Sequence, residues 1–334
     1  MFKDEVILIT GGTGSFGRYL SSHLLKQTQL KKLIVMSRDE WKQWKMAQDF
    51  ENDNGRLEFK IGDVRDLPRL KRLFSGVDVV IHAAALKQVP GCEDNPIEAV
   101  KTNIMGAQNV IESAIDAKVK KVMALITDKS VRPINLYGAT KLVSEKLFVH
   151  ANSYSGSVTK FSCARWGNIV GTRGSVVPLF LEQKRSGVLT LTDPQMTRFF
   201  ITLPQISGLF WKWLETMKGG EVFVPKSPST VLLDLAKALA GKETKIKIVG
   251  KRIGEKVHED LIAENEISRT YDVGKYYVIV PEFSWWNKNN LHTSKLIKGL
   301  DHVASNTTDH FLSVNEIRKE LKALEKREKE RTWH

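Results

Sequence analysis

Most of the side chains that could do acid–base chemistry lie in one stretch of the chain. Thr127, Asp128 and Lys129 are followed by Tyr137 and Lys141. A Tyr and a Lys spaced i, i+4 lie one above the other on a helix, so the ammonium can stabilise the phenolate. Such a tyrosine can act as a base near neutral pH. Next to a nicotinamide, this pair would remove or return a hydroxyl proton while the ring takes or gives a hydride.

A glycine-rich turn near the start of the chain predicts where a dinucleotide would bind. The apolar run at 6–10 is followed at once by the sequence GGTGSFG at 11–17 and then by a helical pattern of leucines. Glycines at a strand-to-helix turn let the backbone approach a pyrophosphate, whose charge lies at the helix N-terminus. The contacts expected from this turn are Gly11, Thr13, Gly14, Ser15, Phe16 and Gly17.

The end of the second predicted strand, at 33–36, bears on the choice of cofactor. Ser37, Arg38 and Asp39 follow it about 20 residues past the glycines, where the adenosine ribose should lie. A hydroxyl and a guanidinium suit a 2′-phosphate, which favours NADP over NAD. A solvated Arg38 is the alternative, and Asp39 leaves NAD open.

Further cofactor contacts are expected after the next strands. The runs at 57–62 and 77–81 predict strands that end near the adenine and near the nicotinamide. A helix over 96–115 carries Asn103, a poor helix former, which we expect to bond backbone near the active site or else to be solvated. His82 is expected to be packed and hydrogen-bonded rather than catalytic. The contacts expected here are Asp63, Val64, Ala83, Ala84, Ala85, Asn103, Tyr137, Lys141 and Ile169.

The order of strand and helix patterns predicts the fold class. The two alternate through 161–165, with a strand at 121–126 that ends at Thr127. This predicts an α/β fold with a doubly wound, Rossmann-like parallel sheet, whose ligands bind at the carboxyl ends of the strands. Past Gly171 the alternation weakens. We therefore expect an NADP-binding domain at 1–170 and, at 171–334, mainly a smaller substrate-binding lobe, with some segments returning to the main sheet.

Composition limits the class of protein. The chain has 334 residues, 42% of them hydrophobic. No apolar run approaches the roughly 18 residues that cross a bilayer, and the start lacks a signal-peptide pattern, so a cytoplasmic enzyme without a membrane partner is expected. Two cysteines, Cys92 and Cys163, exclude a disulfide framework and a cysteine-rich metal site, and no metal is expected. The formal charge of +13 is spread along the chain, which favours anionic small ligands over nucleic acid.

Arginine-bearing loops follow in the second half, at 173–178, 197–199 and 251–256. Guanidinium groups bond phosphate oxygens in pairs, so these loops suit a diphosphate; the alternative for any one arginine is a structural or solvated role. Lys87 would reach a phosphate or a sugar hydroxyl, or would simply be solvated. A charged helix from Ser313 to Arg331 has mixed charges, which predict a solvated face.

Together the motifs resemble those of the inverting UDP-N-acetylglucosamine 4,6-dehydratases, extended short-chain dehydrogenases that begin pseudaminic acid synthesis. The resemblance covers nearly the whole chain through Glu259, although family members typically carry proline where Ile253 stands. The matching motifs are GGTGSFG at 11–17, SRDE at 37–40, TDK at 127–129, NLYGATK at 135–141 and RGSVVP at 173–178.

The resemblance implies an NADP-dependent lyase that converts UDP-N-acetylglucosamine to a UDP-4-keto-6-deoxy-L-hexosamine. Tyr137, helped by Lys141 and Thr127, would take the proton of the 4-hydroxyl while hydride leaves carbon 4. Lys129 would take the proton of carbon 5 and Asp128 would protonate the departing 6-hydroxyl. Hydride then returns to carbon 6, and carbon 5 is reprotonated from the opposite face. The implied UDP contacts are Lys87, Asn168, Arg173, Gly174, Ser175, Val176, Val177, Pro178, Phe180, Arg198, Arg252 and Glu255.

Several alternatives stay open. Lys129 can serve as a base only if burial or a nearby cation lowers its pKa; the alternative is that it only pairs with Asp128 or a phosphate. A sugar-nucleotide epimerase, a retaining 4,6-dehydratase and a non-catalytic NADP-binding regulator remain as other functions. A homo-oligomer is expected, because extended dehydrogenases commonly pair through helices like the one that carries Tyr137. The biological end product is not indicated.

Overall fold

The main body of the protein is one large sheet. The computed structural model describes residues 2–50, 55–156, 158–241, 243–286 and 295–330. Within these residues a ten-stranded sheet has the order β15-β13-β14-β9-β6-β5-β4-β1-β2-β3. Its strands are β1 (Val6–Thr10), β2 (Lys32–Ser37), β3 (Leu57–Ile61), β4 (Val79–His82), β5 (Lys121–Thr127), β6 (Lys160–Trp166), β9 (Val222–Pro225), β13 (Thr270–Asp272), β14 (Tyr276–Ile279) and β15 (Lys295–Leu296).

The predicted fold class is confirmed by the strand order. Strands β1 to β6 are parallel and run β3-β2-β1-β4-β5-β6, the order of a doubly wound nucleotide-binding sheet. The chain reverses direction across the sheet between β1 and β4, where such sheets bind their ligands. The antiparallel β13, β14 and β15 extend the other edge, so segments beyond residue 171 do return to the main sheet.

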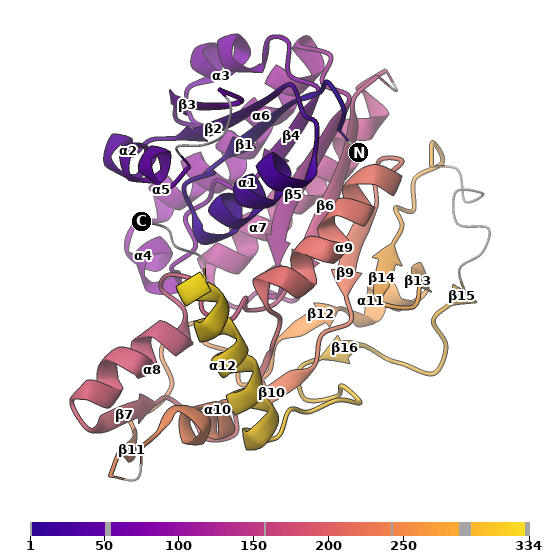
Figure 1. Cartoon of the computed structure of the whole chain (residues 1–334). Coiled ribbons are helices and arrows are strands. Elements are labelled where there is room, and N and C mark those ends of the chain that lie inside the picture. The colour runs from indigo at the N-terminus through magenta and orange to yellow at the C-terminus, as the bar shows by residue number, and fades with distance from the viewer. Residues whose placement is uncertain (1, 51–54, 157, 242, 287–294, 331–334) are drawn as a thin grey trace.

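Helices cover both faces of this sheet (Figure 1). One hydrophobic cluster joins the sheet to α3 (Leu67–Phe74), α6 (Gly106–Asp116) and α7 (Leu136–His150). A second joins the opposite face to α1 (Ser15–Gln27) and α9 (Leu203–Thr216). Because both faces are covered, the central strands are apolar almost throughout, and all four residues of β4 are buried. The smaller α2 (Glu40–Gln48) follows β2.

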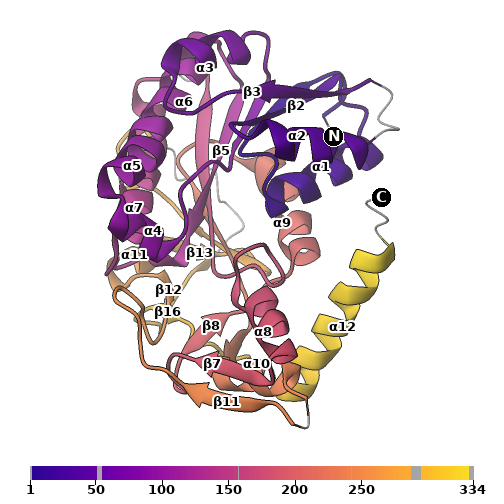
Figure 2. The same ribbon diagram turned by 90° about the vertical axis from the view of Figure 1, so that its left-hand side faces the viewer.

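A smaller lobe lies below the sheet in both views (Figures 1 and 2). Its core, which includes Phe180, Leu235, Ile317 and Leu321, lies among three helices: α8 (Val176–Arg185), α10 (Leu232–Leu239) and α12 (Val314–Glu330). Three two-stranded sheets complete it, formed by β7 (Val188–Leu191) with β11 (Lys245–Ile248), β8 (Thr197–Phe199) with β10 (Ser229–Val231), and β12 (Asp260–Ile262) with β16 (Val303–Ala304). Helix α12 therefore buries one face here, and its predicted end at Arg331 lies outside the described residues.

The predicted continuous helix at 96–115 is wrong in its middle. Helix α5 (Pro96–Val100) passes into a π-helical turn, η1 (Lys101–Met105), before α6 begins. The wider turn carries Asn103, whose side chain is buried and bonds the backbone of Leu86 twice, accepting from N at 2.8 Å and donating to O at 2.9 Å. Its Nδ2 also donates to Thr140 Oγ1 at 3.0 Å. The polar role expected of Asn103 is thus a clamp between α7 and the loop after β4.

Several other expectations concern single residues and short segments. Both cysteines are free and buried, and His82 is buried and shares a hydrogen bond with Thr10 Oγ1 at 2.8 Å, as predicted. Burial lowers the pKa of His82 to about 3, so it is neutral at physiological pH. The remaining helical turns are α4 (Val89–Asp94), η2 (Asp128–Ser130), η3 (Ala151–Ser153) and α11 (Glu264–Ile267). In the part of the chain that the structure describes, every helix is too short or too polar to span a membrane.

Candidate active site

A cavity of about 860 Å³ runs along the carboxyl ends of the central strands to the smaller lobe. It brings together most of the residues predicted from sequence. Those that line it are Gly11, Thr13, Gly14, Ser15, Phe16, Gly17, Ser37, Arg38, Asp39, Asp63, Val64, Ala83, Ala84, Ala85, Lys87, Thr127, Lys129, Tyr137, Lys141, Asn168, Ile169, Arg173, Gly174, Ser175, Val176, Arg198, Arg252 and Glu255.

Five predicted site residues do not line the cavity. Asn103 acts from behind it, as described above, and Asp128 is fully buried beneath Lys129. The others are Val177, Pro178 and Phe180, which the sequence placed in a substrate loop. The loop ends at Ser175 because α8 begins at Val176, and from there only one face of the helix can turn toward the cavity. Val177 and Phe180 instead pack in the core of the smaller lobe.

The turn between β1 and α1 has the geometry that a pyrophosphate needs. Gly11 has φ +65°, and a Cβ there would lie 2.8 Å from the Cα of Ala84, so only glycine fits. Helix α1 starts after Gly14 with no side chain capping its first N–H groups. Free N–H groups and the positive end of the helix dipole together bind anions. The residues present therefore fit a dinucleotide cofactor.

The ribose end of the cavity is defined by the start of α2. The Asp39 carboxylate accepts from Lys42 N at 2.9 Å and pairs with Lys42 Nζ at 2.5 Å, so it is committed to capping the helix. Ser37 Oγ accepts from Gln43 Nε2 at 3.0 Å and is buried. The Arg38 side chain is 53% exposed, with its Nη1 3.9 Å from Asp63 Oδ2. This end of the cavity is thus lined by Arg38 and Lys42 and by two carboxylates, Asp39 and Asp63, that are paired with Lys42 and Arg65.

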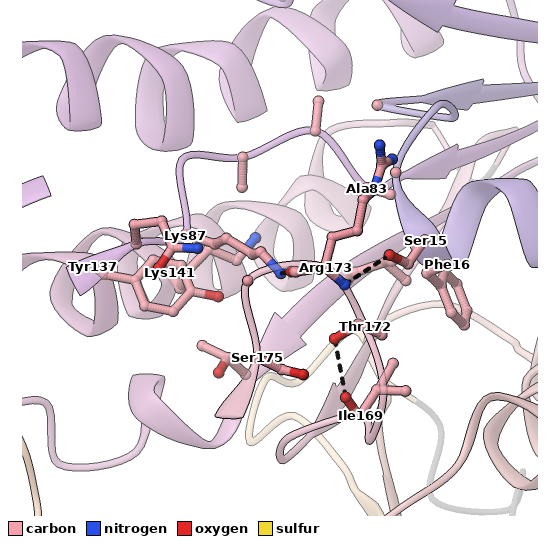
Figure 3. A pocket seen from close by; sticks show the side chains of 18 of the residues that line it. Ser15, Phe16, Ala83, Lys87, Tyr137, Lys141, Ile169, Thr172, Arg173 and Ser175 are labelled. Atoms are coloured by element: carbon pink, nitrogen blue, oxygen red, sulfur yellow. Dashed lines mark hydrogen bonds between the residues drawn. The ribbon is translucent and has the colours of Figure 1, made fainter. Parts of the chain in front are cut away.

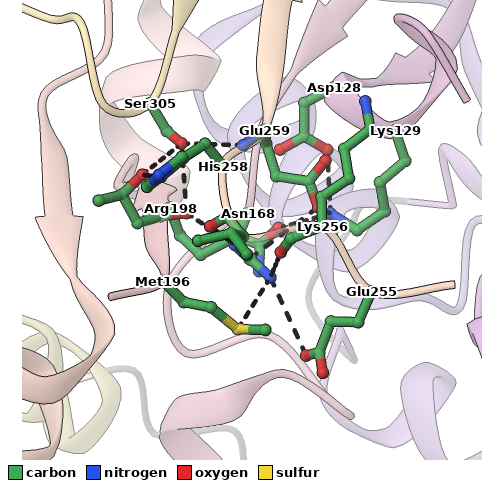
Figure 4. Close-up of polar contacts among 12 residues, drawn as sticks. Asp128, Lys129, Asn168, Met196, Arg198, Glu255, Lys256, His258, Glu259 and Ser305 are labelled. Atoms are coloured by element: carbon green, nitrogen blue, oxygen red, sulfur yellow. Dashed lines mark hydrogen bonds and ion pairs between the residues drawn. The ribbon is translucent and has the colours of Figure 1, made fainter. Parts of the chain in front are cut away.

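The residues at the end of β5 form a buried network of opposite charges (Figure 4). Asp128 Oδ1 accepts from Thr127 Oγ1 at 2.9 Å and from Lys129 Nζ at 3.1 Å. Lys129 Nζ also lies 3.1 Å from Glu259 Oε1 and 3.3 Å from Asn168 Oδ1. Asp128 Oδ2 is buried and has no hydrogen-bond partner in the described structure. The side chains of Asp128 and Glu259 therefore both contact one ammonium group, that of Lys129.

The pKa of Lys129 in this network is not lowered, although a lowered pKa is what a lysine base requires. Burial lowers the pKa of Lys129, but the carboxylates of Asp128 and Glu259 outweigh burial, and the net pKa is raised. Burial likewise raises the pKa of Asp128, despite its ammonium neighbour. Lys129 therefore rests as an ammonium, and the condition under which it could act directly as a base, a lowered pKa, is not met in the protein alone. The second carboxylate, Glu259, comes from a distant part of the sequence.

Tyr137 and Lys141 lie close together on the first turns of α7, with Lys87 beside them (Figure 3). Burial raises the pKa of Tyr137 to about 12, against the opposing effects of the Lys129 charge and the Thr127 hydroxyl. Burial lowers the pKa of Lys141 to about 8. In the protein alone, Lys129 is thus the cation that favours the Tyr137 phenolate, whereas the sequence assigned that effect to Lys141.

Local packing explains how α7 reaches this position. Gly138 is in its first turn, and a Cβ there would lie 2.1 Å from Lys129 O, so any larger residue would push the helix away. Asn135 caps the helix by accepting from Gly138 N at 2.8 Å. Its Nδ2 donates to Gly254 O at 2.8 Å, which ties the redox helix to the loop that carries Arg252.

Two predicted phosphate ligands are placed differently from the expectation. Arg173 lies over the glycine turn: its N donates to Ser15 Oγ at 3.2 Å and its guanidinium to Thr13 O (Figure 3). It therefore lies at the glycine turn, where the pyrophosphate of a dinucleotide is expected. Arg198 Nη1 donates to the carbonyls of Thr197 and Val257, and Nη2 to the carbonyl of Lys256. Because both terminal nitrogens of its guanidinium group donate to backbone carbonyls, Arg198 holds the 256–259 segment in place.

Sequence reasoning missed Glu259 as a site residue. Its side chain is 2% exposed, lines the cavity and contacts Lys129, which precedes it by 130 residues. The only sequence signal was its position at the end of a charged segment, where the resemblance fades. Trp166 and Gln88 also line the cavity without having been predicted.

Comparison with known proteins identifies the family. Residues 7–281 match the family model described as polysaccharide biosynthesis protein. The chain belongs to this family. Within the polysaccharide biosynthesis family, it is 49% identical over 293 residues, 87% of each chain, to a Campylobacter jejuni protein named UDP-N-acetylglucosamine 4,6-dehydratase (inverting). It is 41% identical over 335 residues, 97% of each chain, to a Rickettsia akari protein named UDP-glucose 4-epimerase. The predicted resemblance to the inverting dehydratases is confirmed.

Solved structures of similar proteins have the same fold. The X-ray structure of Pen from Bacillus thuringiensis is 36% identical and covers 96% of this chain and 99% of its own, with a TM-score of 0.89. DesIV from Streptomyces venezuelae, a dTDP-glucose 4,6-dehydratase solved with NAD bound, is 22% identical over 75% of this chain and 86% of its own, with a TM-score of 0.69. This member of the polysaccharide biosynthesis family thus has the same fold as an enzyme solved with NAD bound.

Proposed function

We propose that this enzyme is a hydro-lyase that dehydrates UDP-N-acetylglucosamine with inversion at carbon 5. The observation that carries the proposal is that Tyr137 and Lys129 line one cavity, with Asp128 buried behind Lys129 and its Oδ1 3.1 Å from Lys129 Nζ. Oxidation needs only the tyrosine; elimination of water also needs a base and an acid close by. The 49% identity to a protein named for this reaction supports the same conclusion.

The side chains divide the reaction among them. Tyr137 takes the proton of the 4-hydroxyl, supported by the Thr127 hydroxyl and by the ammonium group of Lys129. A bound nicotinamide supplies reversible hydride transfer. Asp128 has a raised pKa, so it can hold the proton that the departing 6-hydroxyl needs. Lys129 receives the proton of carbon 5, which the 4-ketone has made acidic.

Direct observation of the product tests this function. Proton NMR of the enzyme with UDP-N-acetylglucosamine in deuterated water is expected to show a new 6-deoxy methyl signal and deuterium at carbon 5, in the inverted configuration. Substrate returned with only a changed carbon 4 would instead establish an epimerase, the function favoured by the 97% coverage of the Rickettsia akari relative. Retained configuration at carbon 5 would mean a retaining dehydratase.

We also propose NADP as the cofactor. Asp39, which would bind the free ribose diol of NAD, is committed to Lys42 and the start of α2. Arg38 and Lys42 both line the cavity at this end, where a 2′-phosphate would place its charge. The cationic groups and the absence of a free carboxylate from Asp39 together support NADP over NAD.

Arg38→Ala is expected to weaken NADP binding by about 10- to 100-fold, the loss of one charge-assisted hydrogen bond, and to leave NAD binding nearly unchanged. Titration calorimetry with each cofactor measures both dissociation constants. Lys45→Ala is the matched control, because Lys45 is exposed on α2 away from the cavity. An unchanged ratio of the two constants in Arg38→Ala would remove the basis for NADP.

We further propose that the chain forms a homo-oligomer. A homo-oligomer that pairs through α5, η1 and α7 is supported by Ile97, Met105 and Val143, large apolar side chains that these segments leave exposed. Light scattering that returns the mass of a single chain would contradict it. The cytoplasmic location, the lack of a nucleic-acid partner and the division at residue 170 stay predictions.

A further inference from the structure

Lys129 is placed as a base but is held as an acid. Three oxygens surround its Nζ: Asp128 Oδ1 at 3.1 Å, Glu259 Oε1 at 3.1 Å and Asn168 Oδ1 at 3.3 Å (Figure 4). An ammonium has three N–H donors and no lone pair, so these three acceptors use its full capacity. Before Lys129 can take a proton from carbon 5, one of its own protons must leave.

The three neighbours are not equivalent as acceptors of that proton. The amide of Asn168 is not basic enough to accept it. Asp128 is fully buried and, in the proposed reaction, already carries the proton for the 6-hydroxyl. Glu259 remains. Its Oε1 faces Lys129, and its Oε2 is buried without a hydrogen-bond partner in the described part of the chain.

The backbone around Glu259 fixes it in this place. Glu259 N donates to Ser305 Oγ at 2.9 Å, and Ser305 N donates to Glu259 O at 2.8 Å. Thr197 Oγ1 shares a hydrogen bond with Ser305 Oγ at 2.7 Å. Thr197 of β8 and Ser305, which follows β16, thus hold Glu259, the residue before β12, against Lys129, although no short-range pattern joins them.

We propose that Glu259 takes the proton from Lys129, so that the resulting amine can act at carbon 5. This inference rests on the proposed dehydratase function. In the proposed reaction Glu259 does not contact the reacting atoms of the substrate. It acts only through Lys129, by accepting a proton from its ammonium group.

Every proton in this step has a source and a destination. One N–H bond of Lys129 breaks as an O–H bond forms on Glu259. The amine then takes the proton of carbon 5, whose electron pair forms the carbon 5–carbon 6 double bond as the bond from carbon 6 to its oxygen breaks. Asp128 gives its proton to that oxygen, and water leaves. Asp128 ends as a carboxylate, Glu259 as a carboxylic acid and Lys129 as an ammonium, with the net charge unchanged.

The charges around Glu259 explain why the proton transfer from Lys129 to Glu259 occurs only when substrate is bound. Burial raises the pKa of Glu259, but the charges of Lys129, Arg198 and Lys256 outweigh burial and lower it. Lys129 comes from η2, and Arg198 comes from β8, with its Nε 3.9 Å from Glu259 Oε1. A bound UDP-sugar would expel water from the cavity. Loss of water raises the pKa of a carboxyl and lowers that of an amine, so the two values approach each other from both sides.

Glu259→Gln removes the acceptor and should change the pH profile. In the wild type, the proton moves within the protein, and kcat for dehydration is expected to be flat between about pH 6 and pH 8. In Glu259→Gln, Lys129 must lose its proton to water, so kcat should fall about 100-fold near neutral pH and rise nearly tenfold per pH unit. Reduction of NADP by UDP-N-acetylglucosamine in a single turnover should persist, because it needs Tyr137 and not Glu259.

Three comparisons decide the proposal. Glu259→Asp keeps a carboxylate and should keep the flat profile at a lower kcat, whereas Glu264→Gln, on an exposed site of α11, should resemble the wild type. A kcat of Glu259→Gln that is below the wild-type kcat by the same factor at every pH, or that equals or exceeds the wild-type kcat near neutral pH, would overturn the role in proton transfer. If Glu259→Gln does not fold, a profile of Glu259→Asp that climbs with pH has the same force. A wild type that forms no methyl product defeats the proposed function itself, separately from this inference.

Discussion

Lys129→Ala is expected to abolish dehydration, by about 10²- to 10⁴-fold, while carbon 4 is still oxidised. The reason is the division of roles in the site: Tyr137 takes the proton of the 4-hydroxyl, and Lys129 is the amine nearest to the buried acid, Asp128. Because the Lys129 charge also favours the Tyr137 phenolate, its loss should slow the oxidation of carbon 4 without stopping it. Without the amine, carbon 5 keeps its proton, and the reaction stops at the 4-ketone.

The measurement has two parts. Rapid mixing of Lys129→Ala with NADP and UDP-N-acetylglucosamine should show the reduced nicotinamide accumulating, and NMR in deuterated water should show no deuterium at carbon 5. Lys146→Ala is the matched control, since Lys146 is exposed on the outer side of α7. Continued exchange at carbon 5 in Lys129→Ala would show that another group is the base.

Arg165→Met is expected to destabilise the fold by about 3–5 kcal/mol, the usual cost of removing one partner from a buried ion-pair network. Arg165 is 1% exposed and bonds two carboxylates: Glu145 of α7 at 3.0 and 2.6 Å, and Glu266 of α11 at 2.7 and 2.9 Å. It also donates to Leu261 O at 2.9 Å. One guanidinium thus joins the helix of Tyr137 to the strand that follows Glu259.

The pH dependence of stability gives this prediction a distinctive sign. Against burial, Arg165 holds the pKa of Glu266 down to about 2, below the unfolded value near 4.5. In the wild type, stability from this group is therefore present above about pH 4.5 and is lost as the pH falls toward 2. Without Arg165, burial raises the pKa of the same carboxyl, so stability should fall as the pH rises above about 4.5.

Denaturant unfolding of both proteins at several pH values tests the reversal. Arg165→Lys keeps the positive charge but loses the paired hydrogen bonds of the guanidinium group. Its free energy of unfolding should therefore lie between those of the wild type and Arg165→Met. Lys71→Met removes an exposed ion pair with Asp116 and should leave the midpoint of unfolding in place. If Arg165→Met unfolds at the wild-type denaturant concentration, the network does not contribute to stability as argued.

Short-range patterns in the sequence were sufficient for the cofactor half of the site. The strand, glycine turn and helix at 6–27 are contiguous, so the requirement for glycine at Gly11 and the free start of α1 follow from residues that are neighbours in the chain. The same holds for Tyr137 and Lys141, whose spacing alone puts them on one face of α7. The apolar strands were equally clear, because a sheet covered on both faces needs continuous apolar runs.

Only the tertiary structure decided how the charged groups are paired. The fork of Arg198 is committed to carbonyls, Arg173 faces the glycine turn, and Glu259 meets Lys129 across 130 residues of sequence. The Arg173 and Glu259 contacts join segments that are far apart in the sequence, and no local period encodes them. The pKa of Lys129 illustrates the physical reason: a residue's type and spacing fix what it can donate or accept, but its proton depends on burial and on charges brought near by the rest of the fold.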